Sequence, residues 1–168
     1  MASTTREELE QVINRLLLNF SFGIKSKQVD AVYNVMKNKD TLCLFPTGFG
    51  KSLLYQLLPA VCTELKIVPS PVVIIISPLV SLIEDQVISS NSMPSSLGLS
   101  ASKLDVKYFK EICEGKFNLL FGTPESWLNN TKWREMLSSR LFIQNLVCLV
   151  VDEVHKVSWY VLFCYLCY

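Results

Sequence analysis

The sequence predicts an α/β fold in which a mostly parallel sheet carries helices on both faces. Short apolar runs alternate along the chain with segments whose apolar residues recur at helical spacing. The clearest run, from Val72 to Ile76, is continuously apolar, as an interior parallel strand should be. Strands that alternate with helices form βαβ units, and such units build a parallel sheet.

The first predicted element is an amphipathic helix that ends at Phe22-Gly23. A capping box would open it, formed either by Thr4 with Glu7 or by Thr5 with Glu8. Its apolar stripe at helical spacing consists of Leu9, Val12, Ile13, Leu16, Leu17 and Phe20. A second helix is predicted over 27–38.

An apolar run over 41–45 predicts a buried strand, and a helix is expected to follow it over 52–64. Pro59 should kink that helix or end it early, because proline lacks the N–H that the helix needs. After the strand over 72–76, the remaining predicted elements are a helix over 82–90, a short strand over 97–100, a helix over 105–114, a strand over 118–121, a helix over 127–138 and a strand over 146–151.

The composition is that of a globular intracellular chain. A length of 168 residues is enough for one domain with a full core. Half of the residues are apolar and 18% are charged, which indicates a globular chain. Nucleic-acid-binding proteins often carry an excess of basic residues. The formal net charge of this chain is only +1, so its overall charge does not indicate nucleic-acid binding. The N-terminus is too charged for a secretory signal, and no apolar run reaches the roughly 20 residues of a membrane span. The cysteines are scattered through apolar segments, which indicates reduced thiols. We therefore expect an intracellular protein that is neither secreted nor held in a membrane.

A glycine-containing turn stands between the predicted strand over 41–45 and the helix after it. It reads Pro46-Thr47-Gly48-Phe49-Gly50-Lys51-Ser52. In a phosphate-binding loop, glycines let backbone N–H groups turn inward around phosphates, a lysine reaches the β/γ-phosphates, and a Ser/Thr hydroxyl binds Mg²⁺. The residues that this pattern assigns to nucleotide binding are Thr47, Gly48, Gly50, Lys51 and Ser52, with Ser52 also on the metal. The strict pattern asks for glycine at Phe45, and a Gly-Lys-Ser core alone also fits an unrelated turn-to-helix junction.

An acidic motif, Asp152-Glu153-Val154-His155, follows the predicted strand over 146–151. An acidic side chain at a strand end holds the Mg²⁺ ion that a phosphate loop also binds. Asp152 is therefore the candidate metal ligand, and Glu153 is placed to orient and deprotonate the attacking water. The two motifs together predict a nucleoside triphosphate and Mg²⁺ as cofactors.

Five blocks in order make the chain resemble the N-terminal half of a superfamily 2 helicase, most closely the RecQ family of ATP-dependent DNA helicases. The blocks are Phe22-Gly23 with Gln28, Pro46 to Pro59, Ser77 to Gln86, Thr123 to Glu125, and Val151 to His155. The resemblance covers about Leu18 to Trp159. It implies a RecA-like P-loop NTPase domain with a DExH-type motif and ATP as the nucleotide.

The resemblance also implies roles for residues outside the phosphate loop. Gln28 would read adenine, since its amide offers an acceptor and two donors for the N6/N7 edge, although a solvated helix residue is the alternative. Ser77, Pro78 and Thr123 would contact single-stranded DNA, because hydroxyls and N–H groups at strand-to-helix turns can hold a DNA phosphate. His155 would link the nucleotide state to DNA binding.

Two tryptophans, Trp127 and Trp133, have the chemistry to stack on bases. Packing is the favoured interpretation for both.

Several features depart from the family pattern. The spacing from Gly23 to Gln28 is about three residues shorter than usual in the family, and Lys156 stands where a small or apolar residue is common. We therefore divide the chain into an N-terminal helix over 1–21, an ATP-binding lobe over 22–159 and an unrelated apolar tail over 160–168. The sequence contains no counterpart of the family's second ATPase lobe.

The resulting hypothesis is the ATP-binding lobe of a RecQ-like 3′–5′ DNA helicase, with nuclear location and single-stranded or forked DNA as partner. Without a second lobe, supplied here or in trans, it should bind ATP–Mg²⁺ weakly, hydrolyse it slowly and not unwind DNA. One alternative is a non-enzymatic nucleotide- or DNA-binding module that competes with a full-length relative. Another is a different P-loop enzyme, such as a small-molecule kinase.

Overall fold

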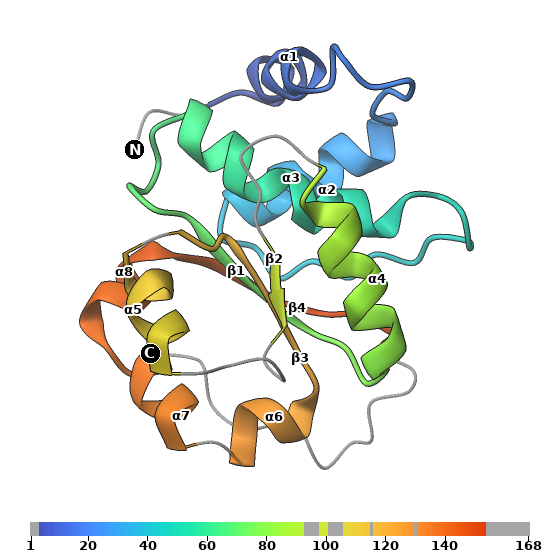
Figure 1. Ribbon diagram of the computed structural model, residues 1–168. Helices are drawn as coiled ribbons and strands as arrows, with labels where there is room; N and C mark the ends of the chain where they lie inside the picture. Colours follow the sequence, from blue (N-terminus) through green and yellow to red (C-terminus); the bar gives the residue numbers. More distant parts are fainter. Residues whose placement is uncertain (1–3, 93–97, 101–105, 115, 130, 154–168) are drawn as a thin grey trace.

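A four-stranded parallel sheet forms the centre of the protein (Figure 1). The structure is a computed structural model and describes residues 4–92, 98–100, 106–114, 116–129 and 131–153. The strands are β1 (Val72–Ile76), β2 (Gly98–Ser100), β3 (Leu119–Gly122) and β4 (Leu146–Val151), in the spatial order β2-β3-β1-β4. The predicted α/β class with a parallel sheet is confirmed.

Helices cover both faces of this sheet, as predicted. They are α1 (Arg6–Leu16), α2 (Ser26–Met36), α3 (Lys51–Glu64), α4 (Val80–Ser90), α5 (Val106–Cys113), α6 (Pro124–Asn129), α7 (Thr131–Leu137) and α8 (Arg140–Asn145). In Figure 1, α1 to α4 lie on one side of the sheet and α5 to α8 on the other. None of the helices in the described ranges is long and apolar enough to cross a membrane.

The alternation of side chains along β1 builds two hydrophobic layers. Val73 and Ile75 are fully buried in the layer beneath α1 to α4, whereas Val72 and Ile74 face the tryptophans and methionine of α6 and α7. Successive strand residues point to opposite faces, so a strand that is covered on both sides must be apolar at every position. This requirement explains why β1 was the clearest strand in the sequence.

A capping box opens α1, and it is the one centred on Thr5. The Glu8 N–H donates to Thr5 Oγ1 at 3.2 Å, and the Thr5 N–H donates to Glu8 Oε2 at 2.8 Å. The helix ends at Leu16, earlier than the predicted Phe22. The predicted apolar stripe is confirmed, since its residues are buried or half-buried in the layer that also contains α2 and α3.

The predicted strand over 41–45 is wrong. These residues form no strand, and Leu42 and Leu44 are 74% and 81% exposed. A strand needs a neighbour whose N–H and C=O groups complete its ladder. In the described part of the chain β4 pairs only with β1, and the segment over 41–45 pairs with no strand of the sheet.

Two other element predictions need comment. Pro59 does not end α3, which continues to Glu64, and the flanking Leu58 and Ala60 are buried; the predicted kink stays a prediction. The predicted helix over 127–138 is two helices, α6 and α7, and α6 begins earlier because Thr123 caps it. The sequence did not predict α8.

Candidate nucleotide-binding site

The glycine-containing loop leads directly into the N-terminus of α3. Gly48 and Gly50 have φ angles of +78° and +88°, and Gly50 is the N-cap residue of the helix. Residues with a side chain rarely adopt this left-handed region, so glycine is needed at both positions. The first N–H groups of a helix lack intrahelical partners and carry the positive end of its dipole. The loop and helix therefore present the kind of backbone donors that bind phosphate.

Lys51 and Ser52 occupy the first turn of α3, and both are half-buried. The Lys51 ammonium group donates to the carbonyl oxygen of Phe45 at 3.3 Å. This single bond holds the side chain against the loop, and an anionic ligand would be a stronger acceptor than the carbonyl.

Gln28, a residue of α2, hydrogen-bonds to the same loop, so a residue from another predicted block lies at the site. It is 2% exposed, which contradicts the alternative of a solvated helix residue. Its Nε2 donates to the carbonyl oxygens of Phe49 and Gly50 at 3.0 and 3.1 Å, and its Oε1 accepts from the Lys25 N–H at 2.8 Å. Both amide donors are therefore used within the protein, and one acceptor lone pair of Oε1 remains.

Lys25 and Phe49 also belong to the site, and the sequence interpretation missed both. The Lys25 ammonium lies 3.3 Å from the Phe49 carbonyl oxygen and 4.0 Å from the centre of the Phe49 ring. That ring stacks on Phe45 with centroids 4.5 Å apart. The sequence feature that could have indicated these contacts is Phe49, an aromatic residue in a loop of otherwise mostly small or polar residues.

Asp152 is positioned by hydrogen bonds at the end of β4. Its N–H donates to the carbonyl oxygen of Ile76 at 2.9 Å, which extends the β1–β4 pairing by one residue. Its Oδ2 accepts from Gln86 Nε2 at 2.8 Å, and its Oδ1 accepts from the Glu153 N–H at 3.0 Å. Glu153 has a φ of +50°, an uncommon conformation for a non-glycine residue and one that is enriched at functional sites.

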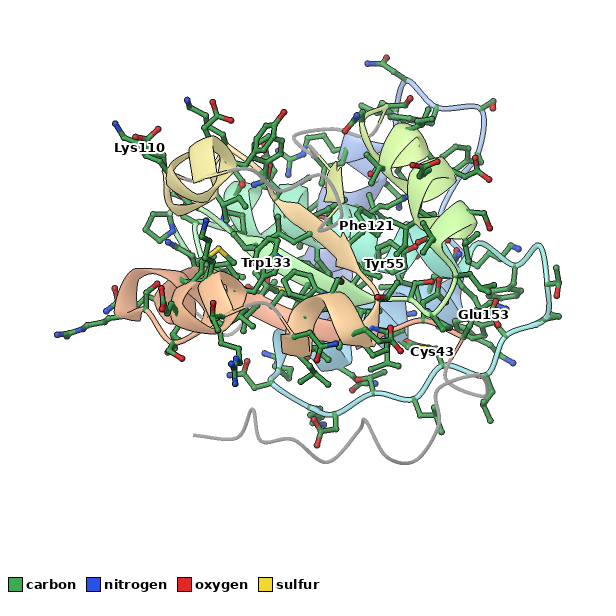
Figure 2. All side chains as sticks on the ribbon, turned by 60° about the horizontal axis from the view of Figure 1, so that its bottom comes forward. Cys43, Tyr55, Lys110, Phe121, Trp133 and Glu153 are labelled. Carbon is green, nitrogen blue, oxygen red and sulfur yellow. The ribbon has the colours of Figure 1, made fainter. Side chains whose placement is uncertain are left out.

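Tyr55 is a buried residue of α3, one turn after Ser52. Burial raises the pKa of its hydroxyl, the nearby Ser52 side chain lowers it, and the Asp152 carboxylate raises it further. Within the described part of the chain this hydroxyl has no hydrogen-bond partner. In Figure 2, Tyr55 and Glu153 lie toward the same end of the molecule, far from Lys110 on α5.

The chemistry of the donors suits Mg²⁺, which prefers hard oxygen ligands and few protein carboxylates. Ser52 supplies a hydroxyl and Asp152 a carboxylate. Among the described residues no group of three or more His, Cys, Asp or Glu side chains could hold a metal ion.

The residues that were assigned to DNA contact lie at the ends of neighbouring strands. Ile76 of β1 pairs with Gly122 of β3, so Ser77 and Thr123 follow paired residues. Ser77 is fully buried, and its N–H donates to the Gly122 carbonyl at 3.0 Å, while Pro78 is half-buried. Thr123 Oγ1 accepts from the Ser126 N–H at 3.2 Å and so caps α6.

Two further predictions concern residues away from these strand ends. Trp127 and Trp133 are 5% and 2% exposed and pack together with ring centroids 4.6 Å apart, which confirms the packing interpretation. His155 and the tail over 160–168 lie outside the described residues.

Comparison with known proteins identifies the family. The sequence pattern of the DEAD/DEAH box helicases matches residues 25–160. The chain is 34% identical to a putative ATP-dependent DNA helicase Q1 of Caenorhabditis elegans, over 76% of this chain and 20% of that protein. It is 35% identical to the ATP-dependent helicase SGS1 of Saccharomyces cerevisiae, over 89% of this chain and 10% of that protein. It is 37% identical to the ATP-dependent DNA helicase Q5 of Rattus norvegicus, over 78% of this chain and 13% of that protein.

The matched region is thus a fifth or less of the length of each of these relatives. The matched residues include the glycine-containing loop, the strand ends and Asp152. The chain belongs to the DEAD/DEAH box helicase family, as an ATPase domain of the RecQ-like kind.

Proposed function

We propose that this chain binds ATP with Mg²⁺ and serves as the ATP-binding lobe of a RecQ-like 3′–5′ DNA helicase. The observation that carries the proposal is the glycine-containing loop, in which Gly48 and Gly50 adopt φ angles of +78° and +88° directly before Lys51 and Ser52 at the N-terminus of α3. Asp152 follows β4, a strand that α3 contacts, so a Mg²⁺ ion shared by Ser52 and Asp152 would join the two motifs.

Each residue of the site has a role in this proposal. Backbone N–H groups of Thr47, Gly48 and Gly50 hold the phosphates, Lys51 reaches the β/γ-phosphates, Ser52 and Asp152 hold the metal, and Glu153 orients and deprotonates water. The metal, when bound, neutralises charge that develops on the phosphates. Lys51 releases the Phe45 carbonyl when the stronger phosphate acceptor arrives.

Gln28 contributes to base recognition through the lone pair that remains on Oε1. The 6-amino group of adenine is a donor that this oxygen can accept, whereas guanine presents an acceptor oxygen at the same position. Donation to adenine N7 would first require release of the Phe49 or Gly50 carbonyl. We therefore expect a preference for ATP over GTP that rests on one hydrogen bond.

Single-stranded or forked DNA is the proposed partner, since the relatives named above include ATP-dependent DNA helicases. The carboxyl ends of β1 and β3 form the proposed DNA-facing edge. Pro78 and Thr123 contact DNA there, and Ser77, which is buried, supports the turn. His155 links this edge to the nucleotide, and a nuclear location follows from DNA as substrate.

Strand separation requires two lobes that close on ATP and reopen after hydrolysis. An arginine from a second element contributes about 10³–10⁵ in rate in related phosphoryl-transfer sites. The 168 residues alone should therefore bind ATP, hydrolyse it slowly and not unwind DNA. A second lobe, in the same protein or in trans, would supply this arginine and the surface against which the first lobe closes.

Equilibrium binding of a fluorescent ATP analogue with Mg²⁺ tests the proposal. Lys51→Ala should weaken binding at least about tenfold, because it removes the cation nearest the β/γ-phosphates. Lys39→Ala, which removes an exposed lysine outside the site, should bind like the wild type. Equal affinities for all three proteins would contradict a nucleotide site at this loop. Tight binding without turnover, even when a second lobe is added, would favour the non-enzymatic alternative.

A further inference from the structure

The N-terminus of α2 holds the outer half of the glycine-containing loop through a set of contacts that we call the α2 clasp, made by Lys25, Gln28 and Phe49. We propose that Lys25 and Phe49 are positioning residues which, with Gln28, orient the loop's N–H groups for phosphate before any nucleotide is bound. The inference rests on the proposed nucleotide site. It adds a set of contacts that hold the loop in its binding conformation before nucleotide is present.

Three hydrogen bonds from two side chains converge on two consecutive carbonyls of the loop. Gln28 Nε2 donates to the Phe49 and Gly50 oxygens, and Lys25 Nζ donates to the Phe49 oxygen. Gln28 is itself fixed, because it is buried and its Oε1 accepts from the Lys25 N–H. This last bond is the return half of a capping box, in which the third residue of a helix bonds back to the N-cap. The start of α2 thus sets where the amide points.

The Phe49 side chain adds a second attachment. The Lys25 ammonium lies 4.0 Å from its ring centre, and the Phe45 ring lies 4.5 Å away at an interplanar angle of 29°. Phe45 covers one face of the Phe49 ring and leaves no room there for an ammonium group. The Lys25 ammonium therefore lies over the opposite face of the Phe49 ring. The negative face of an aromatic ring attracts a cation, which makes Lys25 bind both the side chain and the main chain of one residue.

The consequence follows from the planarity of the peptide bond. In a trans peptide, the C=O of one residue and the N–H of the next point in opposite directions. Drawing the Phe49 and Gly50 carbonyls toward α2 therefore directs the N–H groups of Gly50 and Lys51 away from α2. Consecutive N–H groups held on one side form the concavity that binds an anion.

Gly50 is where the clasp comes closest to the loop. A Cβ added there would lie 2.9 Å from Gln28 Nε2, and φ is +88°. The conformation therefore disfavours any residue with a side chain, and a Cβ would displace the Gln28 amide from the Phe49 and Gly50 carbonyls.

The test begins in the nucleotide-free protein, where base recognition plays no part. The Phe49 N–H donates to the Pro46 carbonyl at 3.2 Å, so its hydrogen exchange reports on the loop turn. Lys25→Met and Phe49→Leu should each speed exchange at this amide by about three- to tenfold, as expected for the loss of a local contact. Lys25→Arg and Phe49→Tyr should restore the wild-type rate, since they retain the cation and the ring. Lys39→Met serves as the matched control.

The double variant Lys25→Met/Phe49→Leu should speed exchange by less than the product of the two single effects, because either single variant already removes the contact between the Lys25 ammonium and the Phe49 ring. In analogue binding, the two single variants should weaken affinity several-fold without changing the ATP-to-GTP ratio. Wild-type exchange rates in Lys25→Met and Phe49→Leu would overturn the clasp. Faster exchange in a protein that binds no nucleotide would retain the clasp and refute the proposed function.

Discussion

The carboxylate of Asp152 has little freedom, because each of its oxygens accepts a hydrogen bond from the protein. Gln86 Nε2 holds Oδ2 and the Glu153 N–H holds Oδ1. Groups that orient a metal ligand typically change metal affinity or activity by 10- to 100-fold when they are removed. Gln86 is 6% exposed, so water does not readily replace it.

Gln86→Met should therefore raise the Mg²⁺ concentration needed for half-maximal ATP-analogue binding by about tenfold. Methionine is similar in length and apolar, so the fold should persist and can be checked by thermal melting. Gln144→Met, at an exposed position on α8, is the control and should leave the Mg²⁺ dependence unchanged. An unchanged Mg²⁺ requirement in Gln86→Met would show that this glutamine does not support a metal ligand.

The buried thiol of Cys62 and the half-buried thiol of Cys148 give the stability of the protein a pH dependence. Burial raises the pKa of Cys62 to about 12, and burial together with Cys62 raises that of Cys148 to about 12. Above about pH 9 the unfolded chain loses these protons while the folded chain keeps them, so the free energy of unfolding falls as pH rises from 9 to 12. Cys62→Ala should show a shallower fall between pH 8 and 10.5 in urea unfolding. A fall as steep as that of the wild type would assign the effect to other groups.

At the scale of elements, the capping box of α1 offers a direct measurement. Thr5→Ala removes the side-chain acceptor for the Glu8 N–H and should cost about 1 kcal/mol. This corresponds to a fall in Tm of about 2–4 °C for a chain of this size. Glu7→Ala changes the same turn at an exposed side chain outside the box and is the matched control. Equal Tm values for the two variants would mean that α1 frays without affecting the rest of the fold.

The sequence predicted those elements whose residues report their own surroundings. The strand over 72–76 is apolar at every position because both of its faces are covered, and Thr5 with Glu8 marks a helix start locally. The run over 41–45 looked equally strand-like, but an apolar pattern does not show whether a neighbouring strand is present. The break between α6 and α7 was missed because helical periodicity continues across it.

For the molecule as a whole, the motifs located the site better than they described its contacts. The Gly-Lys-Ser turn and the acidic strand end predicted the place where α3 and β4 meet, because parallel strands bring their carboxyl ends to one edge. No role there was assigned to Gln86, Lys25 or Phe49. Their contacts depend on packing between elements that are distant in sequence. The prediction for His155 stays untested, since that residue lies outside the described part.

The exposed leucines at 42 and 44 have a practical consequence for anyone who isolates this domain. They lie in a segment that forms neither helix nor strand, and in the described residues β4 leaves one edge of the sheet without a paired strand. Free strand edges and exposed apolar side chains are features through which proteins self-associate. The fraction of monomeric protein should therefore fall as protein concentration rises. The double variant Leu42→Lys/Leu44→Lys should stay monomeric at higher concentration, and it changes no residue of the proposed nucleotide site.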